Sequence, residues 1–176
     1  MASSTTFTTL KDDLRRYLER GSTYAADAVV FEQLPRLINL AERRIARELK
    51  IQGFINVVTG TLTTGLSVYD KPDRWRDTVS MTIGTGSDGN TRTPVFTRSY
   101  EYVRSYWPDS TQTDQPVFYA DYDYSHWLIA PTPDADYPFE VVYYQIPQLL
   151  DETVQSNWLT EYAPELLLYA SLLEAT

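Results

Sequence analysis

The chain has 176 residues, of which 43% are hydrophobic and 14% aromatic, so it can bury a core and is not predicted to be disordered. It contains no cysteine, which excludes a disulfide scaffold and is compatible with assembly in a reducing cytoplasm. No apolar run approaches the roughly 20 residues that a membrane-spanning helix needs, so we expect no membrane partner.

The net charge of −9 is distributed unevenly along the chain. Residues 1–99 contain 14 basic and 11 acidic side chains, whereas residues 100–176 contain 13 acidic side chains and one basic side chain, Arg104. Because nucleic-acid phosphates repel an acidic surface, we do not expect the second half of the chain to bind DNA. The alternative, that the surplus of acids only keeps the protein in solution, stays open at this stage.

Two helices are predicted near the N-terminus. The first is expected over residues 10–20, with Thr8 or Thr9 as its cap. The second is expected to begin at Pro35, because proline suits a first helical turn, and a shorter helical piece over residues 28–34 precedes it.

The second predicted helix has two opposite faces. Its apolar residues form one stripe, which is predicted to face the core: Leu34, Ile38, Ala41, Ile45 and Leu49. Its basic residues form a stripe on the other side, with Leu40 beside it: Arg36, Arg43, Arg47 and Lys50. Two interpretations of the basic stripe are open, a solvated surface or a docking surface for an acidic neighbour.

The pattern then changes to one typical of strands. Five segments rich in β-branched and aromatic residues are separated by turn signals, and they cover residues 56–63, 79–83, 116–120, 126–129 and 139–144. Short strands at this spacing predict an antiparallel sandwich or barrel. A short helix over Ser99–Trp107 is expected inside this region, because Pro108 would stop it.

A third helical segment is predicted at the C-terminal end. It begins near Asn157 as a short turn, restarts at Pro164 and continues through a run of leucines that is apolar almost all the way round. A helix of this kind has to be covered on several sides, and the two N-terminal helices are the obvious partners.

The predicted fold class is therefore α+β. Residues 1–52 and 152–176 are expected to pack as a helical bundle, and an antiparallel β-sandwich or barrel-like domain, residues 53–151, is inserted between them. The sequence stops without a glycine, a proline or a basic last turn, so we also expect the native polypeptide to continue past Thr176.

No catalytic or metal-binding constellation stands out, and we predict no enzyme activity and no cofactor. The single histidine, His126, has neither a cysteine nor a second histidine with which to hold a metal ion. Asp121 and Asp123 belong to a run that lacks the glycine and the closing glutamate of a calcium loop, and Asp134 and Asp136 lie in a proline-flanked turn where Asp is common. These four residues are our candidates for an acidic surface.

Several segments, in order, resemble those of the tailed-phage head-to-tail (portal–nozzle) adaptor proteins. The similar segments are Leu34–Lys50, Pro116–Ala120, Leu128–Asp134, Val142–Pro147, Asn157–Leu159 and Ala163–Ala175, while residues 59–110 match only loosely. The resemblance implies a structural virion protein of the neck and tail, a ring subunit that forms a dodecamer. It also implies that the helical part grips the portal protein, that the β part faces the tail nozzle protein, and that DNA passes the channel without specific binding.

By the same resemblance, the basic stripe would contact the acidic half of a neighbouring subunit. That contact would be a heterologous, ring-closing interface formed by Arg36, Leu40, Arg43, Arg47 and Lys50. Members of the family usually continue past the last helix with a segment that embraces the portal.

Two other functions remain open. The chain could be a phage or bacterial β-sandwich module that binds carbohydrate or protein, with an aromatic groove formed by Trp107, Tyr119, Tyr122, Tyr124 and Trp127. It could also be an acidic hydrolase that uses two carboxylates, although no pair is singled out.

Overall fold

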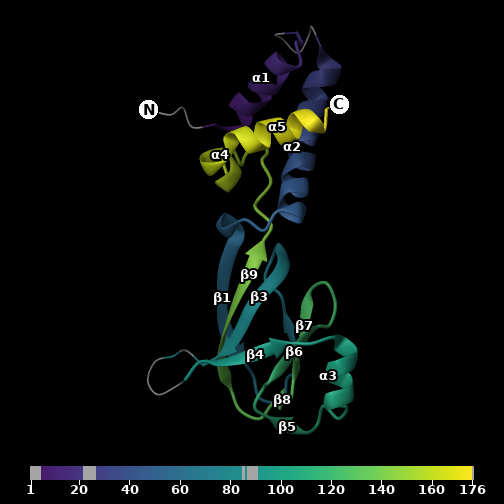
Figure 1. The fold of residues 1–176 in the computed structure, drawn as a ribbon, viewed down its shortest axis with the longest axis vertical. Helices are drawn as coiled ribbons and strands as arrows, with labels where there is room; N and C mark the ends of the chain where they lie inside the picture. The colour runs from purple at the N-terminus through teal and green to yellow at the C-terminus, as the bar shows by residue number, and fades with distance from the viewer. Residues whose placement is uncertain (1–4, 22–26, 85, 87–90, 176) are drawn as a thin grey trace. The chain divides into compact units, whose positions relative to one another are not determined.

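The computed structural model describes residues 5–21, 27–84, 86 and 91–175, and the chain divides into two compact units. The helical unit consists of Met1–Phe54 and Ile146–Thr176, and the sheet unit consists of Ile55–Gln145 (Figure 1). Because both ends of the chain belong to the helical unit, the sheet unit is an insertion between its two halves.

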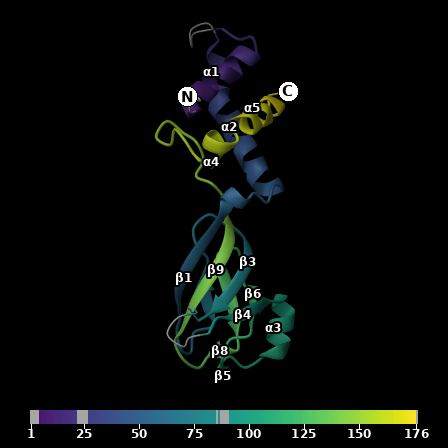
Figure 2. The ribbon, with the colours of Figure 1, turned by 60° about the vertical axis from the view of Figure 1, so that its left-hand side comes forward.

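The helical unit contains α1 (Phe7–Tyr17), α2 (Ala28–Glu48), the short 3-10 turn η1 (Gln52–Phe54), α4 (Trp158–Tyr162) and α5 (Pro164–Leu173). α2 contacts both α1 and α5, and α1 also contacts α5. Figures 1 and 2 show that α5 runs across α2 and not alongside it. The predicted bundle of packed helices is therefore not confirmed.

α1 begins and ends about three residues earlier than predicted. The Thr6 side chain accepts a hydrogen bond from the backbone N–H of Thr9, and the Thr9 hydroxyl accepts one in return from the backbone N–H of Thr6. This reciprocal pair is a capping box, so the prediction of Thr8 or Thr9 as the cap is wrong.

α2 is one continuous helix of 21 residues, so the predicted break at Pro35 is wrong. A proline inside a helix typically costs about 3 kcal/mol, which is why the local signal favours an interruption. Here the flanking Leu34 and Ile38 are both completely buried, and this packing outweighs the local preference. Leu49, which was predicted to lie in the core, is the C-cap residue and is 41% exposed.

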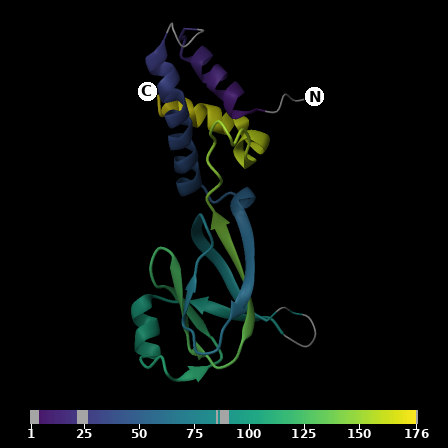
Figure 3. The same ribbon diagram turned by 180° about the vertical axis from the view of Figure 1, so that it is seen from behind.

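The sheet unit contains one seven-stranded mixed sheet. In spatial order its strands are β1 (Ile55–Leu62), β9 (Tyr137–Gln145), β3 (Trp75–Ile83), β4 (Thr93–Thr97), β6 (Phe118–Asp121), β7 (His126–Ala130) and β2 (Val68–Asp70). β5 (Thr113–Asp114) and β8 (Thr132–Pro133) form a separate pair. Figure 3 shows β1 and β9 side by side as they cross the unit.

The prediction of a purely antiparallel sheet is wrong at two pairs, because β4–β6 and β5–β8 are parallel. The connection from β4 to β6 includes α3 (Tyr100–Tyr106). Parallel neighbours need such a crossover, because the chain has to return to the end of the sheet at which the first strand began. α3 itself agrees with the prediction, since Ser99 is its N-cap and Trp107 its C-cap.

The sheet curves until it is nearly closed, and six of its strands contribute to one core. The fully buried members of this core include Leu62 of β1, Met81 of β3, Val141 of β9 and Trp127 of β7. The indole N–H of Trp127 donates a hydrogen bond of 3.2 Å to the Thr78 hydroxyl, so its one polar atom has a partner inside the protein. The α+β class and the barrel-like curvature of the sheet agree with the sequence analysis.

Candidate interaction surfaces

Within the described parts of the chain, no group of three or more His, Cys, Asp or Glu side chains could hold a metal ion. In the same residues, no helix is both long and apolar enough to cross a bilayer. The candidate residues lie instead on the surfaces of the two units, and each surface can be built up from its elements.

The basic face of α2 consists of Arg36, Leu40, Arg43 and Arg47, and Lys50 follows just after the helix. The four helical positions are spaced i, i+4, i+7 and i+11, so they lie on one side of the helix. All five residues are exposed, and Leu40 places an apolar side chain, 40% exposed, among the arginines. The structure therefore brings the predicted helical residues together on one open surface, while their role in an interface stays a prediction.

Another side of α2 binds the chain that returns from the sheet unit, through a polar clamp formed by Asn39, Glu42, Leu150 and Asn157. The Asn39 amide donates to the Leu150 carbonyl oxygen at 2.9 Å, and the Leu150 N–H donates to Glu42 Oε2 at 3.1 Å. The Asn157 amide donates to Glu42 Oε1 at 2.6 Å. Because Leu150 is almost completely buried, both of its backbone groups need these partners.

Glu42 is the one completely buried carboxylate among the described residues. Burial raises the pKa of Glu42 to about 7, because removal from water disfavours the charged form. The hydrogen bonds from Leu150 and Asn157 and the positive charge of Arg43 oppose this rise in the pKa. The sequence analysis missed this residue, although its place four residues after Ile38 sets it beside the buried stripe.

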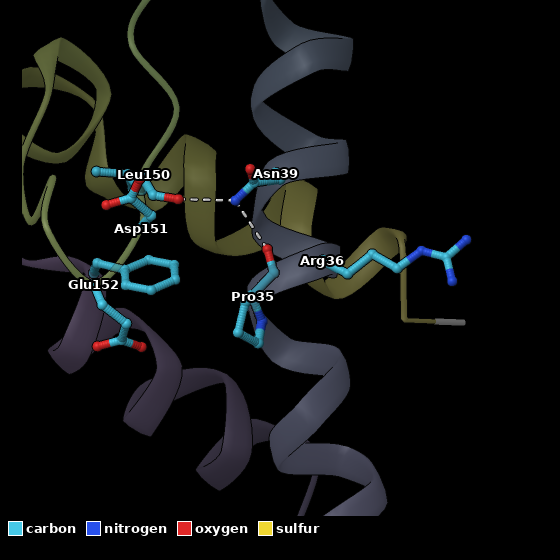
Figure 4. Close-up of a pocket in the computed structure, with 7 residues that line it drawn as sticks. Pro35, Arg36, Asn39, Leu150, Asp151 and Glu152 are labelled. Atoms are coloured by element: carbon cyan, nitrogen blue, oxygen red, sulfur yellow. Dashed lines mark hydrogen bonds between the residues drawn. The ribbon is translucent and has the colours of Figure 1, made fainter.

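Next to the clamp lies a pocket of about 400 Å³ (Figure 4). Its lining residues are Phe7, Pro35, Arg36, Asn39, Leu150, Asp151 and Glu152. The Asp151 carboxylate accepts hydrogen bonds from Thr153 and from the Val154 N–H, which lower the pKa of Asp151, and Glu152 forms an ion pair with Lys11. Figure 4 shows the Arg36 guanidinium pointing away from the pocket. The two pocket acids thus hold the local structure, and Arg36 belongs to the outer, basic face.

In the sheet unit, Asp121 and Asp123 stabilise the β6–β7 hairpin. Asp121 lies 2.8 Å from the ammonium of Lys71, whose side chain is almost completely buried against the ring of Trp75. Asp123 lies 2.8 Å from His126 Nδ1 and also accepts hydrogen bonds from the backbone N–H groups of Ser125 and His126. The hydrogen bond with His126, followed by those from Ser125, lowers the pKa of Asp123. The prediction of a polar hairpin turn is confirmed.

Asp134 and Asp136 are exposed in the connection between β8 and β9. Asp136 accepts hydrogen bonds from the backbone N–H and the hydroxyl of Thr64, which lower the pKa of Asp136. Asp134 accepts a hydrogen bond of 2.7 Å from the Tyr137 hydroxyl and raises the pKa of Tyr137 to about 12. Each of the four acids therefore has a local structural role, and their function as one acidic surface stays a prediction.

The aromatic groove that a sugar-binding module would need is not formed by the predicted residues. Trp127 and Tyr119 are 1% and 5% exposed and belong to the core of the sheet unit. Tyr122 and Tyr124 are exposed, and the partly buried Trp107 donates its indole N–H to a backbone carbonyl oxygen. The prediction fails because β7 is buried along most of its length.

Comparison with known protein families identifies the family of this chain. A family model described as "SU10 adaptor protein" matches residues 5–176, which is nearly the whole chain. A search of curated proteins found no match.

Proposed function

Since the chain belongs to the SU10 adaptor protein family, we propose that it is a head-to-tail adaptor ring subunit that connects the portal to the tail nozzle. This family is a phage head–tail adaptor family, so the chain is a structural protein of the virion. The ring is a homo-oligomer, by analogy a dodecamer, that assembles in the host cytoplasm and leaves a channel for DNA.

The match to the family model over residues 5–176 is the observation that carries this proposal. It is supported by α2, which buries one face and presents an exposed basic face on the other side. In the proposed ring, the helical part (residues 1–52 and 152–176) grips the portal, and the β part (residues 53–151) faces the nozzle. Arg36, Leu40, Arg43, Arg47 and Lys50 form the interface with a neighbouring subunit.

The acidic second half of the chain is proposed to let DNA pass without being held. Residues 100–176 carry 13 acidic side chains and one basic side chain. A channel lined by acids repels phosphates and makes none of the contacts that give non-specific DNA binding. Asp121, Asp123, Asp134 and Asp136 are the candidates for this lining, since all four are exposed.

The test is assembly on the portal. The purified chain is mixed with the portal ring of the same phage, and the product is analysed by sedimentation and by negative-stain imaging. We expect images that show a second ring on one end of the portal. The mass of the complex from sedimentation should give the number of subunits in that ring. A chain that leaves the portal ring bare at every mixing ratio would overturn the proposal.

A further inference from the structure

The last helix leaves an apolar face uncovered. Leu167 and Ser171 of α5 are completely buried, whereas Leu166, Tyr169 and Leu173 are 39%, 56% and 66% exposed. The exposed residues are spaced i, i+3 and i+7, so they lie on one side of the helix. Tyr162 at the end of α4 is 70% exposed and precedes them in the chain. We refer to Leu166, Tyr169 and Leu173 as the α5 face. An exposed apolar surface of this kind marks an interaction site.

The charges that α4 and α5 contribute beside the α5 face are opposite to those on α2, and Arg44 of α2, which reaches the end of α5, is paired there with Glu174 at 3.1 Å. Glu161 and Glu165 are exposed within α4 and α5, and residues 105–176 contain no lysine or arginine. The basic face of α2 has the reverse arrangement, with arginines around the half-exposed Leu40. Each surface thus has an apolar part and a charged border, and the borders are of opposite sign, which favours binding of one surface to the other.

These two surfaces do not meet within one chain. α2 and α5 pack against each other, and the buried residues include Ile38 and Ala41 on α2 and Leu167 on α5. On each helix the exposed residues lie on the other side from the buried ones, so neither exposed surface is used up by the packing of α2 on α5. Two different, complementary surfaces that are both open on the same unit are the requirement for a heterologous interface, in which every copy uses one surface on each neighbour.

We propose that the basic face of α2 in one copy of this chain docks onto the α5 face of the next copy. The proposal rests on the proposed function and names the contact that closes the ring. Leu40 packs between Leu166 and Tyr169 of the neighbour, and Arg36, Arg43 and Arg47 pair with the carboxylates of Glu161 and Glu165. Tyrosine and arginine together are the residue types that most often dominate such interfaces.

The absence of cysteine from the sequence allows a direct test by cross-linking. Two single-cysteine variants, Leu40→Cys and Tyr169→Cys, are prepared and treated with a short bismaleimide, separately and as a mixture, at rising protein concentration and on the portal ring. The mixture should give a cross-linked dimer, and each variant alone should not, because a heterologous contact never brings two copies of one position together. Cross-linking of either variant with itself, or no dimer in the mixture, would overturn the proposal.

Charge reversal provides a second measurement that does not depend on the cross-linker. The Arg36→Glu/Arg43→Glu variant should associate with itself at least about tenfold more weakly in sedimentation, and so should Glu161→Arg/Glu165→Arg. A chain that carries all four changes should regain association, because the attractive pairing is restored with the signs exchanged. Arg16→Glu, at an exposed position of α1, is the matched control and should leave association unchanged. Four changes that fail to restore association in a chain with intact circular dichroism would contradict the proposal.

The two proposals fail in distinguishable ways. Binding to the portal ring without a cross-link between positions 40 and 169 would remove this inference and leave the adaptor function standing. A cross-linked head-to-tail oligomer that does not bind the portal would remove the adaptor function and leave this contact standing. A chain that remains monomeric under all of these conditions would overturn both.

Discussion

The candidate acids Asp121 and Asp123 of the sheet unit have partners inside that unit, whereas the basic face of α2 and the α5 face of the helical unit are exposed. The sheet unit buries a core around Trp127 and a second, smaller one around Leu128, and its candidate acids are engaged nearby, Asp121 with Lys71 and Asp123 with His126. The helical unit covers only one side of α2 and one side of α5, and it leaves an exposed basic face and an exposed apolar face.

This difference indicates where association with other proteins gains its free energy. Surface that is already packed inside a unit gains little from a partner, whereas exposed apolar surface gains from leaving water when a partner covers it. In the helical unit, Leu40 and the α5 face are surface of this kind. The sheet unit also exposes apolar side chains, including Val57, Val79 and Phe96, but the interface proposed above uses the helical unit alone. The largest expected effects on stability and on assembly should therefore fall in different units.

The largest effect on stability is expected from Trp127→Ala in the sheet core. Trp127 is 1% exposed, and truncation of a buried Trp to Ala typically costs about 3–5 kcal/mol of unfolding free energy. Calorimetry should show a strongly lowered melting temperature. The helical signal in far-ultraviolet circular dichroism should persist at a temperature where the sheet has melted, because α1, α2, α4 and α5 belong to the other unit.

The matched control for this variant is Tyr124→Ala, in the hairpin that precedes β7. Tyr124 is 78% exposed, so its truncation should change the unfolding free energy by no more than about 0.5 kcal/mol. Equal destabilisation by the two variants would contradict the placement of the core. If both units unfolded in a single transition, they would not be independent folding units.

A smaller effect, which depends on pH, is expected in the helical unit from Glu42. Its pKa in the folded chain is about 7, above the ordinary value of 4.5, so the folded chain binds the proton more tightly than the unfolded chain. The stabilisation is therefore fully present below pH 4.5 and is lost as the pH rises to about 7. The difference between these two pKa values corresponds to a change of about 3 kcal/mol in the free energy of unfolding. Urea denaturation followed through the helical circular-dichroism signal would measure this change.

Glu42→Gln should remove this pH dependence, because glutamine does not titrate. The substitution also removes an acceptor, since its amide group cannot accept from both Leu150 and Asn157, so the variant should be less stable than the parent at pH 4.5. Glu48→Gln is the control, because Glu48 is an exposed glutamate of the same helix that pairs with Arg44 at 3.2 Å. A pH slope that persists in Glu42→Gln and disappears in Glu48→Gln would show that Glu42 is not the titrating group.

The strands of the fold could be predicted where a hydrophobic or β-branched pattern extends over several residues. All five predicted strands are present, as β1, β3, β6, β7 and β9. β2 was missed because it has three residues, and β4 was missed because Pro94 inside a short run argues against a strand. The parallel pairing of β4 and β6 could not be predicted, because it depends on the path that the chain takes through α3.

The sequence predicts where a candidate residue lies only when its position is determined by a single helix or strand. The helical period is sufficient to place Arg36, Arg43 and Arg47 on one side of α2. It cannot show that Glu42 is buried, because the residues that cover it return to α2 more than 100 positions later in the sequence. Nor could alternation along β7 show that Trp127 is inside, since both sides of that strand are covered by core residues.

The smallest effect on stability is expected from substitution of the acids of the sheet unit. This effect distinguishes an acid that stabilises the fold from one that is available to a partner. The pKa of Asp123 in the folded chain lies below its ordinary value, so its contribution to stability is present above that value and is lost as the pH falls. Asp123→Asn should therefore lower the melting temperature at pH 7. The deficit should shrink as the pH falls below the ordinary value of 3.8, because the parent carboxylate then becomes protonated in turn.

Asp134→Asn removes the same single charge and can still accept the hydrogen bond from Tyr137, so it controls for net charge and should melt close to the parent. Neither variant should weaken association between copies if the helical unit supplies the whole interface. Equal melting temperatures for the two variants at pH 7 would mean that the Asp123–His126 contact contributes nothing to folding. Weakened association in either variant would place part of the interface in the sheet unit and would end the division of roles between the two units.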